Sequence, residues 1–402
     1  MRRTWLRAGR GPWMLQGAGV VGWPGCVAIL WTTGWVIGAH TQARAARGKN
    51  VLIIAVDTLR WDAVSLHSPH EYIRDLTPNL RRLLAPRAVE FRNAYSQAPW
   101  TLPAFASMFT GLYPEQHGAE DVYRRLEPEQ LPLAEILRDN GYVTMAVVSG
   151  HFLTAEVGLA QGFTMHDQSQ ALNGMVITAQ HVTDRAIQLL ADNRDRPFFL
   201  FVHYFDPHCV YRDHPEFSFA TQGRPLEVLG WAQLAFFGRF RANLVPPARQ
   251  AELRALYDEE VAYTDLHIGR LLDFLTEAGL WDSTCVIFVA DHGEEFLDHG
   301  SAGHAETLFQ ELIHVTLLIA DPSRPAPAVV NRRVETRWLF PTILNIVRAD
   351  PPSGPASSSD LFAPCENGEY WVRSSTRPQP LSTLREGSVA GIWLSCLVSD
   401  RY

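Results

Sequence analysis

The sequence predicts an α/β protein with a doubly wound, mainly parallel sheet flanked by helices. Three observations support this prediction. Short apolar runs of strand length alternate with helical patterns through residue 347. Several of these runs end in a carboxylate or a histidine, as at Asp57 and Asp291. The chain has 402 residues, which is enough to bury a large core.

The first 45 residues are predicted to direct export. Four arginines within the first ten residues form a basic region, and residues 13–39 carry no charge. Ala43-Arg44-Ala45 offers a cleavage site with small residues at both ends. Residues 13–39 are also long enough to cross a bilayer, so a cleaved signal peptide and a retained membrane anchor fit equally well. Both place the body of the chain in the periplasm or outside the cell.

The composition excludes a general nucleic-acid binder. The formal net charge is −8 at pH 7, with 43 acidic against 35 basic residues. A protein that holds the phosphate backbone by charge needs a basic face, and this balance does not indicate one. We therefore expect no nucleic-acid partner.

The elements expected before residue 210 alternate between strands and helices. Continuous apolar runs are typical of buried strands, and apolar residues at helical spacing predict helices. The expected strands are residues 50–57, 89–95, 142–148 and 197–204. The expected helices are residues 77–84, 131–138 and 176–192.

The second half of the chain continues the alternation as far as residue 347. The expected elements are helices over residues 248–275 and 336–347 and strands over residues 285–290 and 315–320. Residues 351–359 are rich in proline and serine and predict a linker. Two short strands follow, over residues 369–373 and 388–398. We expect an export or anchor segment (1–45), a main domain (50–350), and a linker with a short C-terminal β subdomain (351–402).

A hydroxyl residue, Thr101, stands at the start of a predicted helix. Pro103 fits the first turn of such a helix, where a missing N–H costs nothing. One interpretation makes Thr101 the residue that caps the helix N-terminus. The other makes it a nucleophile, because unpaired N–H groups and the helix dipole stabilise an oxyanion there. The second interpretation requires a base or a metal nearby.

Polar groups follow three of the predicted strands. They are Asp57, then Asp206 with His208, then Asp291 with His292. The carboxyl ends of parallel strands meet at one edge of the sheet, where open α/β proteins bind ligands. Two carboxylates, an imidazole and the Thr101 hydroxyl would form a site for one divalent cation. The imidazole favours zinc or manganese over calcium.

The chain resembles the sulfatase family of the alkaline phosphatase superfamily, from residue 50 to about residue 365. Five motifs in the family's order carry the resemblance, among them NVLIIAVDTLRWD, HYFDPHCVY and ADHGEEFLDHG. They occupy residues 50–62, 91–118, 203–211, 290–300 and 303–318. The resemblance implies the family's doubly wound sheet over residues 50–350, followed by a C-terminal subdomain.

The resemblance also implies roles for single residues. Asp57, Asp291 and His292 match metal ligands of the family. Thr101 matches the nucleophile, which also touches the metal.

Three further positions match residues near the transferred group. His208 matches a histidine that contacts this group or protonates the leaving group. His304 falls where many sulfatases have a lysine that reaches the sulfate. Asn93 resembles a residue near the transferred oxygens in related phosphonate and phosphate ester hydrolases. A second metal would have Asp206, His208 and His304 as ligands, since two-metal members exist in the superfamily.

The sequence departs from sulfatases that use formylglycine. Those enzymes need Cys or Ser at the nucleophile, followed by x-Pro-x-Arg, whereas this chain has Thr101-Leu102-Pro103-Ala104-Phe105. A threonine nucleophile is similar to that of phosphodiesterases, phosphatases and phosphoethanolamine transferases of the superfamily. The usual Asp-Asp pair after the first strand is Asp57-Thr58 here, which disfavours calcium.

The resemblance implies an exported, metal-dependent hydrolase of phosphate or sulfate esters that forms a threonine ester. The substrate would be a small molecule, a glycan or a lipid ester. Two alternatives remain open. One is a phosphoethanolamine-type transferase that acts on a membrane lipid or glycan, which a membrane anchor would suit. The other is a non-catalytic protein that binds anions.

Overall fold

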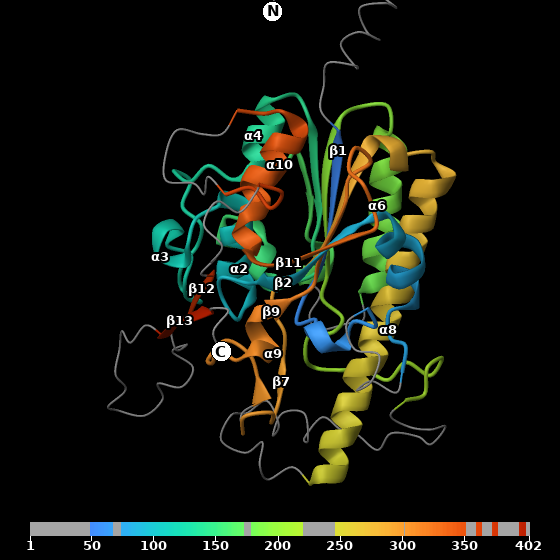
Figure 1. Ribbon diagram of the computed structural model, residues 1–402, viewed down its shortest axis with the longest axis vertical. Helices are drawn as coiled ribbons and strands as arrows, with labels where there is room; N and C mark the ends of the chain where they lie inside the picture. The colour runs from blue at the N-terminus through green and yellow to red at the C-terminus, as the bar shows by residue number, and fades with distance from the viewer. Residues whose placement is uncertain are drawn as a thin grey trace, which may run out of the picture. The chain divides into compact units, whose positions relative to one another are not determined.

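The computed structural model describes residues 49–66, 74–172, 178–219, 246–300, 302–350, 359–363, 372–376 and 394–398 (Figure 1). The predicted export segment and all but the last residue of the predicted linker (351–359) lie outside the described residues. In the part of the chain that is described, no helix has both the length and the apolarity needed to cross a membrane.

A nine-stranded sheet forms the centre of the fold. Strand β1 (Asn50–Val56) lies between β5 (Phe198–Tyr204) and β6 (Thr284–Ala290) and is parallel to both. The remaining strands of the path are β3 (Val143–Val147) and β4 (Met165–Asp167) beyond β5, and β10 (Leu317–Ala320), β2 (Val89–Tyr95) and β11 (Ala328–Glu335) beyond β6. Strand β10 runs antiparallel to both of its neighbours. The prediction of a mainly parallel sheet is confirmed.

Helices cover both faces of the sheet, as predicted for a doubly wound fold (Figure 1). Helices α6 (Ala179–Asn193) and α8 (Pro247–Glu277) pack together on one face. Helices α2 (Thr101–Thr110), α4 (Leu133–Asp139) and α10 (Leu339–Val347) lie on the other. All ten residues of α2 are buried. Two of them, Phe105 and Phe109, pack edge-on against Phe201 of β5.

Several elements differ from the prediction. The helix expected from residue 77 is a short π-helix, η2 (Leu80–Leu84). The strand expected over residues 315–320 is split into β9 (His314–Val315), which pairs with β2, and β10, which pairs with β6 and β2. Strand β11 was not predicted, because its sequence AVVNRRVE carries charges and lies at the sheet edge.

Two small antiparallel sheets lie outside the main one. Strands β7 (Glu295–Phe296) and β8 (Ala302–Gly303) form the first. Strands β12 (Val372–Thr376) and β13 (Leu394–Val398) form the second, close to the two strands predicted after the linker.

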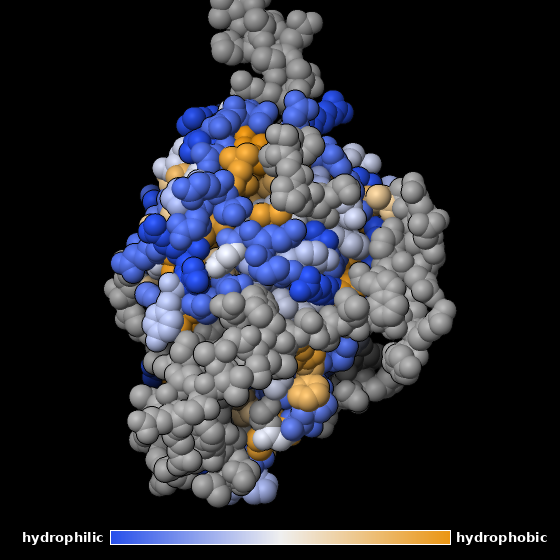
Figure 2. All heavy atoms as spheres, turned by 90° about the vertical axis from the view of Figure 1, so that its left-hand side faces the viewer, coloured by the Kyte–Doolittle hydropathy of each residue, from blue (hydrophilic) through white to orange (hydrophobic). Residues whose placement is uncertain are grey.

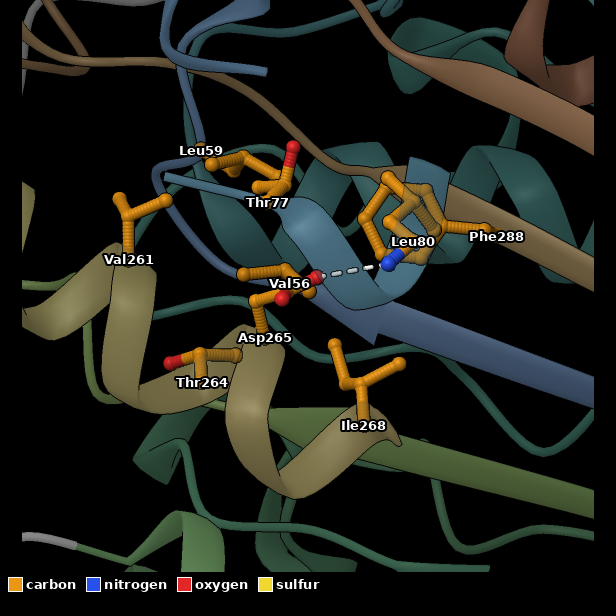
Figure 3. A pocket seen from close by; sticks show the side chains of 9 residues that line it. All are labelled: Val56, Leu59, Thr77, Leu80, Val261, Thr264, Asp265, Ile268 and Phe288. Atoms are coloured by element: carbon orange, nitrogen blue, oxygen red, sulfur yellow. Dashed lines mark hydrogen bonds between the residues drawn. The ribbon is translucent and has the colours of Figure 1, made fainter. Parts of the chain in front are cut away.

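A small cavity lies beneath η2 (Figure 3). Its volume is about 10 Å³, which is no more than one water molecule needs. The Asp265 carboxylate at its wall accepts hydrogen bonds from the backbone N–H groups of Asn79 (2.8 Å) and Leu80 (2.9 Å). The cavity is too small for a substrate, so Asp265 has a structural task, which is to hold η2 against α8.

On the face shown in Figure 2, the described surface is mainly hydrophilic, with apolar side chains in small separate groups. Large apolar side chains that are well exposed among the described residues are Tyr123, Leu131, Leu266, Phe309 and Val329. Single exposed apolar residues of this kind are normal on a folded protein and indicate no partner.

His117 is a buried histidine of the second motif. Its Nδ1 accepts a hydrogen bond from the Ala119 N–H (3.1 Å), and its Nε2 lies 3.1 Å from the Ser107 hydroxyl. Burial lowers the pKa of His117 from 6.5 to about 3. This histidine therefore stays neutral in the fold and ties the end of α2 to the following loop.

His117 predicts a loss of stability in acid. Its pKa is lower in the folded chain than in the unfolded chain, so its contribution is complete above pH 6.5 and falls as the pH drops toward 3. The slope from this group approaches about 1.4 kcal/mol per pH unit. His117→Gln should lower the free energy of unfolding at pH 7 and remove this part of the slope, as measured by urea unfolding between pH 7 and pH 4. Equal slopes in the two proteins would contradict the assignment.

Candidate active site

Two carboxylates meet because β1 and β6 run parallel and in register. Val56 pairs with Ala290 at the carboxyl ends of these strands, and Asp57 and Asp291 are the next residues. His292 follows directly. Ligand atoms of Asp57, Asp291 and His292 all lie within 4.8 Å of one another, and the three residues are fully buried.

The atoms that face one another in this cluster are all acceptors. The Nδ1 of His292 lies 2.9 Å from the Gly293 carbonyl, which can only accept, so Nδ1 carries the hydrogen. The Nε2 lone pair then lies 3.5 Å from Asp57 Oδ1 and 3.4 Å from Asp291 Oδ2. Both of these carboxylate oxygens are buried without a hydrogen-bond partner. Converging lone pairs with no donor between them fit a bound divalent cation.

The pKa values of the two carboxylates are shifted in opposite directions. Burial raises the pKa of Asp291 well above its usual range, and the neighbouring Asp57 raises it further. Burial also raises the pKa of Asp57. The interactions of Asp57 with His203 and with the nearby His292 lower this pKa by more, so it lies below its usual value.

Thr101 is the first residue of α2, and its side chain does not cap the helix. The N-cap is Trp100, in extended conformation and without a side-chain capping bond. The Thr101 Oγ1 lies 3.3 Å from Asp57 Oδ2 and 3.5 Å from His292 Nε2. The hydroxyl thus faces the cluster, beside the N–H groups at the helix N-terminus.

A strained turn holds Asp57 in place. Thr58, the next residue, has φ +52°, which is rare for a β-branched side chain. The Tyr257 hydroxyl of α8 donates to the Thr58 carbonyl (3.0 Å) and accepts the Arg60 N–H (2.9 Å). Strain of this kind persists only where surrounding contacts fix it.

Tyr257→Phe should destabilise the protein by about 1–3 kcal/mol, because it leaves two buried backbone groups without their partner. Urea unfolding of the variant measures the loss. Tyr123→Phe is the matched control, since Tyr123 is 81% exposed and its change should cost less than about 0.5 kcal/mol. Equal stability of the Tyr257 variant and the unaltered chain would show that the turn needs no such anchor.

His208 and His304 border the cluster. The Nδ1 of His208 donates to the Cys209 carbonyl (2.7 Å), and its ring stacks on Phe205 with a centroid distance of 4.2 Å. The His304 ring centroid lies 4.9 Å from that of His208 and 4.7 Å from that of His292. Three imidazoles therefore lie side by side at this edge of the sheet.

Glu294 contacts His304 from the interior. Its Oε1 lies 3.0 Å from the Nδ1 of His304, and its Oε2 accepts the Tyr211 hydroxyl (3.3 Å). Burial raises the pKa of Glu294 to about 7. When this carboxyl is protonated, it donates to Nδ1 and leaves the hydrogen of the neutral ring on Nε2.

The sulfatase family model matches residues 49–349. The chain belongs to the sulfatase family.

Curated relatives in this family are distant in sequence. Arylsulfatase K of Homo sapiens is 22% identical over an alignment 406 positions long, which covers 90% of this chain and 75% of that protein. N-sulphoglucosamine sulphohydrolase of Homo sapiens is 26% identical over 350 residues, which cover 82% of this chain and 65% of that protein. The chain spans 57% of the length of arylsulfatase K from Xenopus laevis and 62% of that from Canis lupus familiaris.

Solved structures show the same fold. The phosphonate monoester hydrolase of Silicibacter pomeroyi aligns with a TM-score of 0.66 at 22% identity, covering 87% of this chain and 85% of that one. The corresponding enzyme of Agrobacterium radiobacter aligns with a TM-score of 0.64 at 21% identity, covering 82% and 81%.

Within this sulfatase-family chain, His203 joins the cluster, although the sequence analysis did not single it out. It is fully buried on β5, and its Nε2 lies 3.2 Å from Asp57 Oδ2. Strand register places it there, because His203 pairs with Ala55, two residues before Asp57. A histidine within an apolar strand, close to its carboxyl end, was the clue in the sequence.

The structure corrects the prediction that Asp206 helps to hold a second metal. Its Oδ1 accepts the N–H groups of Thr178 (2.9 Å) and Ala179 (3.0 Å), and its Oδ2 accepts the Thr178 hydroxyl (2.6 Å). Both oxygens thus cap helix α6. The prediction failed because the partners lie 28 residues away in the sequence.

Asn93 lies on β2, away from the cluster at the end of β1. Its Nδ2 donates to the Asn331 carbonyl of β11 (2.6 Å), and β10 and β6 separate its strand from β1. The hydrogen bond of this amide joins β2 to the edge strand β11, and the contact of Asn93 with the transferred oxygens stays a prediction.

Proposed function

We propose that this chain is an exported, metal-dependent hydrolase of phosphate, phosphonate or sulfate esters with Thr101 as its nucleophile. The main support is the position of the Thr101 hydroxyl, which lies at a helix N-terminus and faces Asp57 and His292. An N-capping threonine would instead bond to its own helix.

The metal would be held by Asp57, Asp291 and His292, with the Thr101 oxygen beside it. These residues fit a divalent cation, because two orphaned carboxylate oxygens and one imidazole lone pair converge. The imidazole favours zinc or manganese over calcium. When bound, the cation would supply positive charge that lowers the pKa of the hydroxyl and stabilises charge on the transferred oxygens.

Thr101 would attack the phosphorus or sulfur atom in line. A bond forms between Oγ1 and that atom, and the bond to the leaving oxygen breaks. Asp57 Oδ2, at 3.3 Å, is placed to take the hydroxyl proton, and the N–H groups of α2 stabilise the negative charge on Oγ1. Water then cleaves the threonine ester and restores the hydroxyl.

His208 is the proposed general acid. Because its Nδ1 hydrogen is held by the Cys209 carbonyl, its Nε2 carries a proton only in the imidazolium form. Burial lowers the pKa of His208, so less of its imidazolium form is present than in an exposed histidine. This fraction falls further as the pH rises. Proton donation to a poor leaving group should therefore weaken with rising pH.

His304 is the proposed donor to a non-bridging oxygen. Glu294 holds its Nδ1, and the protonated form of Glu294 keeps a hydrogen on Nε2 of a neutral ring. A neutral donor can stabilise developing charge without being consumed in the proton transfer to the leaving group.

Phosphorus esters are the favoured substrates. Solved relatives of the fold include both phosphonate monoester hydrolases and a 2-O GAG sulfatase, and curated relatives in sequence include sulfatases. The threonine in place of Cys or Ser favours the phosphorus esters. A lipid or glycan ester fits the predicted export and membrane association of residues 1–45.

Turnover of paired aryl esters tests this proposal. The protein, loaded with zinc or with manganese, is given p-nitrophenyl phenylphosphonate, bis-p-nitrophenyl phosphate and p-nitrophenyl sulfate. We expect the phosphorus esters to be hydrolysed faster than the sulfate. A faster sulfate reaction would make the chain a sulfatase with a threonine nucleophile. Metal binding without turnover of any ester would support the non-catalytic alternative.

A further inference from the structure

We propose that Thr376, on strand β12 of the second small sheet, is a positioning residue for His304 and acts through the backbone of Ala305. This inference rests on the proposed function, because it takes His304 as the donor to the transferred group. It gives strand β12 a part in that site.

Ala305 adopts a conformation that needs support. Its φ is +81°, in the left-handed region that residues with a Cβ atom rarely occupy. A conformation of this kind costs on the order of 1–3 kcal/mol and persists where neighbouring groups determine it. Ala305 directly follows His304, so its backbone sets the place from which the imidazole starts.

Both backbone groups of Ala305 are held by distant parts of the chain. Its N–H donates to the Pro99 carbonyl (2.9 Å), and its carbonyl accepts the Thr376 hydroxyl (2.6 Å). Pro99 stands two residues before Thr101. The same hydrogen bond therefore fixes the His304 segment relative to the proposed nucleophile.

Strand β12 is anchored to the same loop. The Ser375 N–H donates to the Gln97 carbonyl (2.9 Å), and the Ser374 hydroxyl donates to the Ser96 carbonyl. Thr376 itself is 2% exposed. Strand β12, whose Thr376 lies 71 residues beyond Ala305, thus holds both the loop before Thr101 and the segment after His304.

The imidazole of His304 has two constraints as a result. Glu294 holds Nδ1 at the ring, and the Pro99–Ala305–Thr376 contacts hold the backbone. Loss of the Thr376 hydroxyl leaves the left-handed Ala305 with one of these backbone bonds removed. The ring can then leave the position in which it meets the substrate.

A double-mutant cycle separates positioning from general structure. Thr376→Val keeps the shape and removes the donor, and Thr376→Ser keeps the donor. We expect Thr376→Val to lower kcat about tenfold with little change in KM, and Thr376→Ser to stay within about twofold of the unaltered chain. In a His304→Ala background, Thr376→Val should cost less than about twofold, because the residue it positions is gone.

Two kinetic results would overturn the proposal. An equal loss from Thr376→Val with and without His304 would mean that Thr376 acts on structure in general. Failure of Thr376→Ser to restore kcat, in a protein with an unchanged melting temperature, would mean that the hydroxyl is not the active group.

A spectroscopic readout keeps the test independent of activity. In ¹³C-labelled protein, the His304 ring Cε1–H signal is identified by its absence in His304→Ala. We expect this signal to shift in Thr376→Val and to stay in place in Thr376→Ser, with the His117 signal as an internal control. An unmoved His304 signal in Thr376→Val overturns the proposal. If the signal shifts while His304→Ala keeps full turnover, the positioning stands and the role of His304 in the proposed function fails.

Discussion

Replacing Thr101 with alanine is expected to lower kcat/KM on aryl phosphorus esters by on the order of 10³-fold or more. The substitution removes the only hydroxyl that the described residues place between Asp57 and His292 at the start of α2. It leaves the helix intact, because the N-cap is Trp100 and no capping bond of Thr101 is lost. Steady-state kinetics of the metal-loaded variant measure the loss.

Thr101→Ser is the matched control for this prediction. Serine keeps a hydroxyl at the same place, so its activity should remain much nearer to that of the unaltered chain. Urea unfolding should show that the alanine variant is folded. Full activity in folded Thr101→Ala would exclude Thr101 as the nucleophile.

Replacing Asp291 with asparagine is expected to abolish stabilisation by a divalent cation. In the unaltered chain, a cation at 1,000 times its Kd should raise the free energy of unfolding by about 4 kcal/mol. Asp291→Asn should lose most of this gain, since one charged ligand is missing. Thermal unfolding, with zinc, with manganese or after chelation, measures the effect.

The same variant distinguishes a metal ligand from a structural carboxylate. Two carboxylates buried side by side disfavour the ionised form of Asp291. Without metal, Asp291→Asn should therefore be at least as stable as the unaltered chain. Asp265→Asn is the contrasting control, because Asp265 supports η2 and its loss should destabilise the protein with or without metal. A metal response equal to that of the unaltered chain would remove Asp291 from the ligand set.

Local pattern was enough to predict the strands that carry the cluster. The apolar runs before Asp57 and Asp291 are long, uninterrupted and bounded, so β1 and β6 were predicted within one residue of their observed ends. Parallel pairing then brings the two carboxylates together without further information. Pro103 in the first turn was enough to predict the helix that begins at Thr101.

Other features depend on contacts that no local pattern contains. Asp206 and Asn93 have the residue types of a site, but partners on α6 and β11 take up their polar atoms. His203 joins the cluster only because β5 lies beside β1. Strand β11 has a charged, half-exposed sequence that resembles a loop until its pairing with β2 is known.

The measurement that tests the central claim most directly is mass spectrometry of the protein quenched during turnover of an aryl phosphonate ester. We expect a phosphonyl adduct on the peptide that contains Thr101, and none in Thr101→Ala. An adduct on another residue, or fast turnover in which no adduct forms and Thr101→Ala retains full activity, would contradict the account.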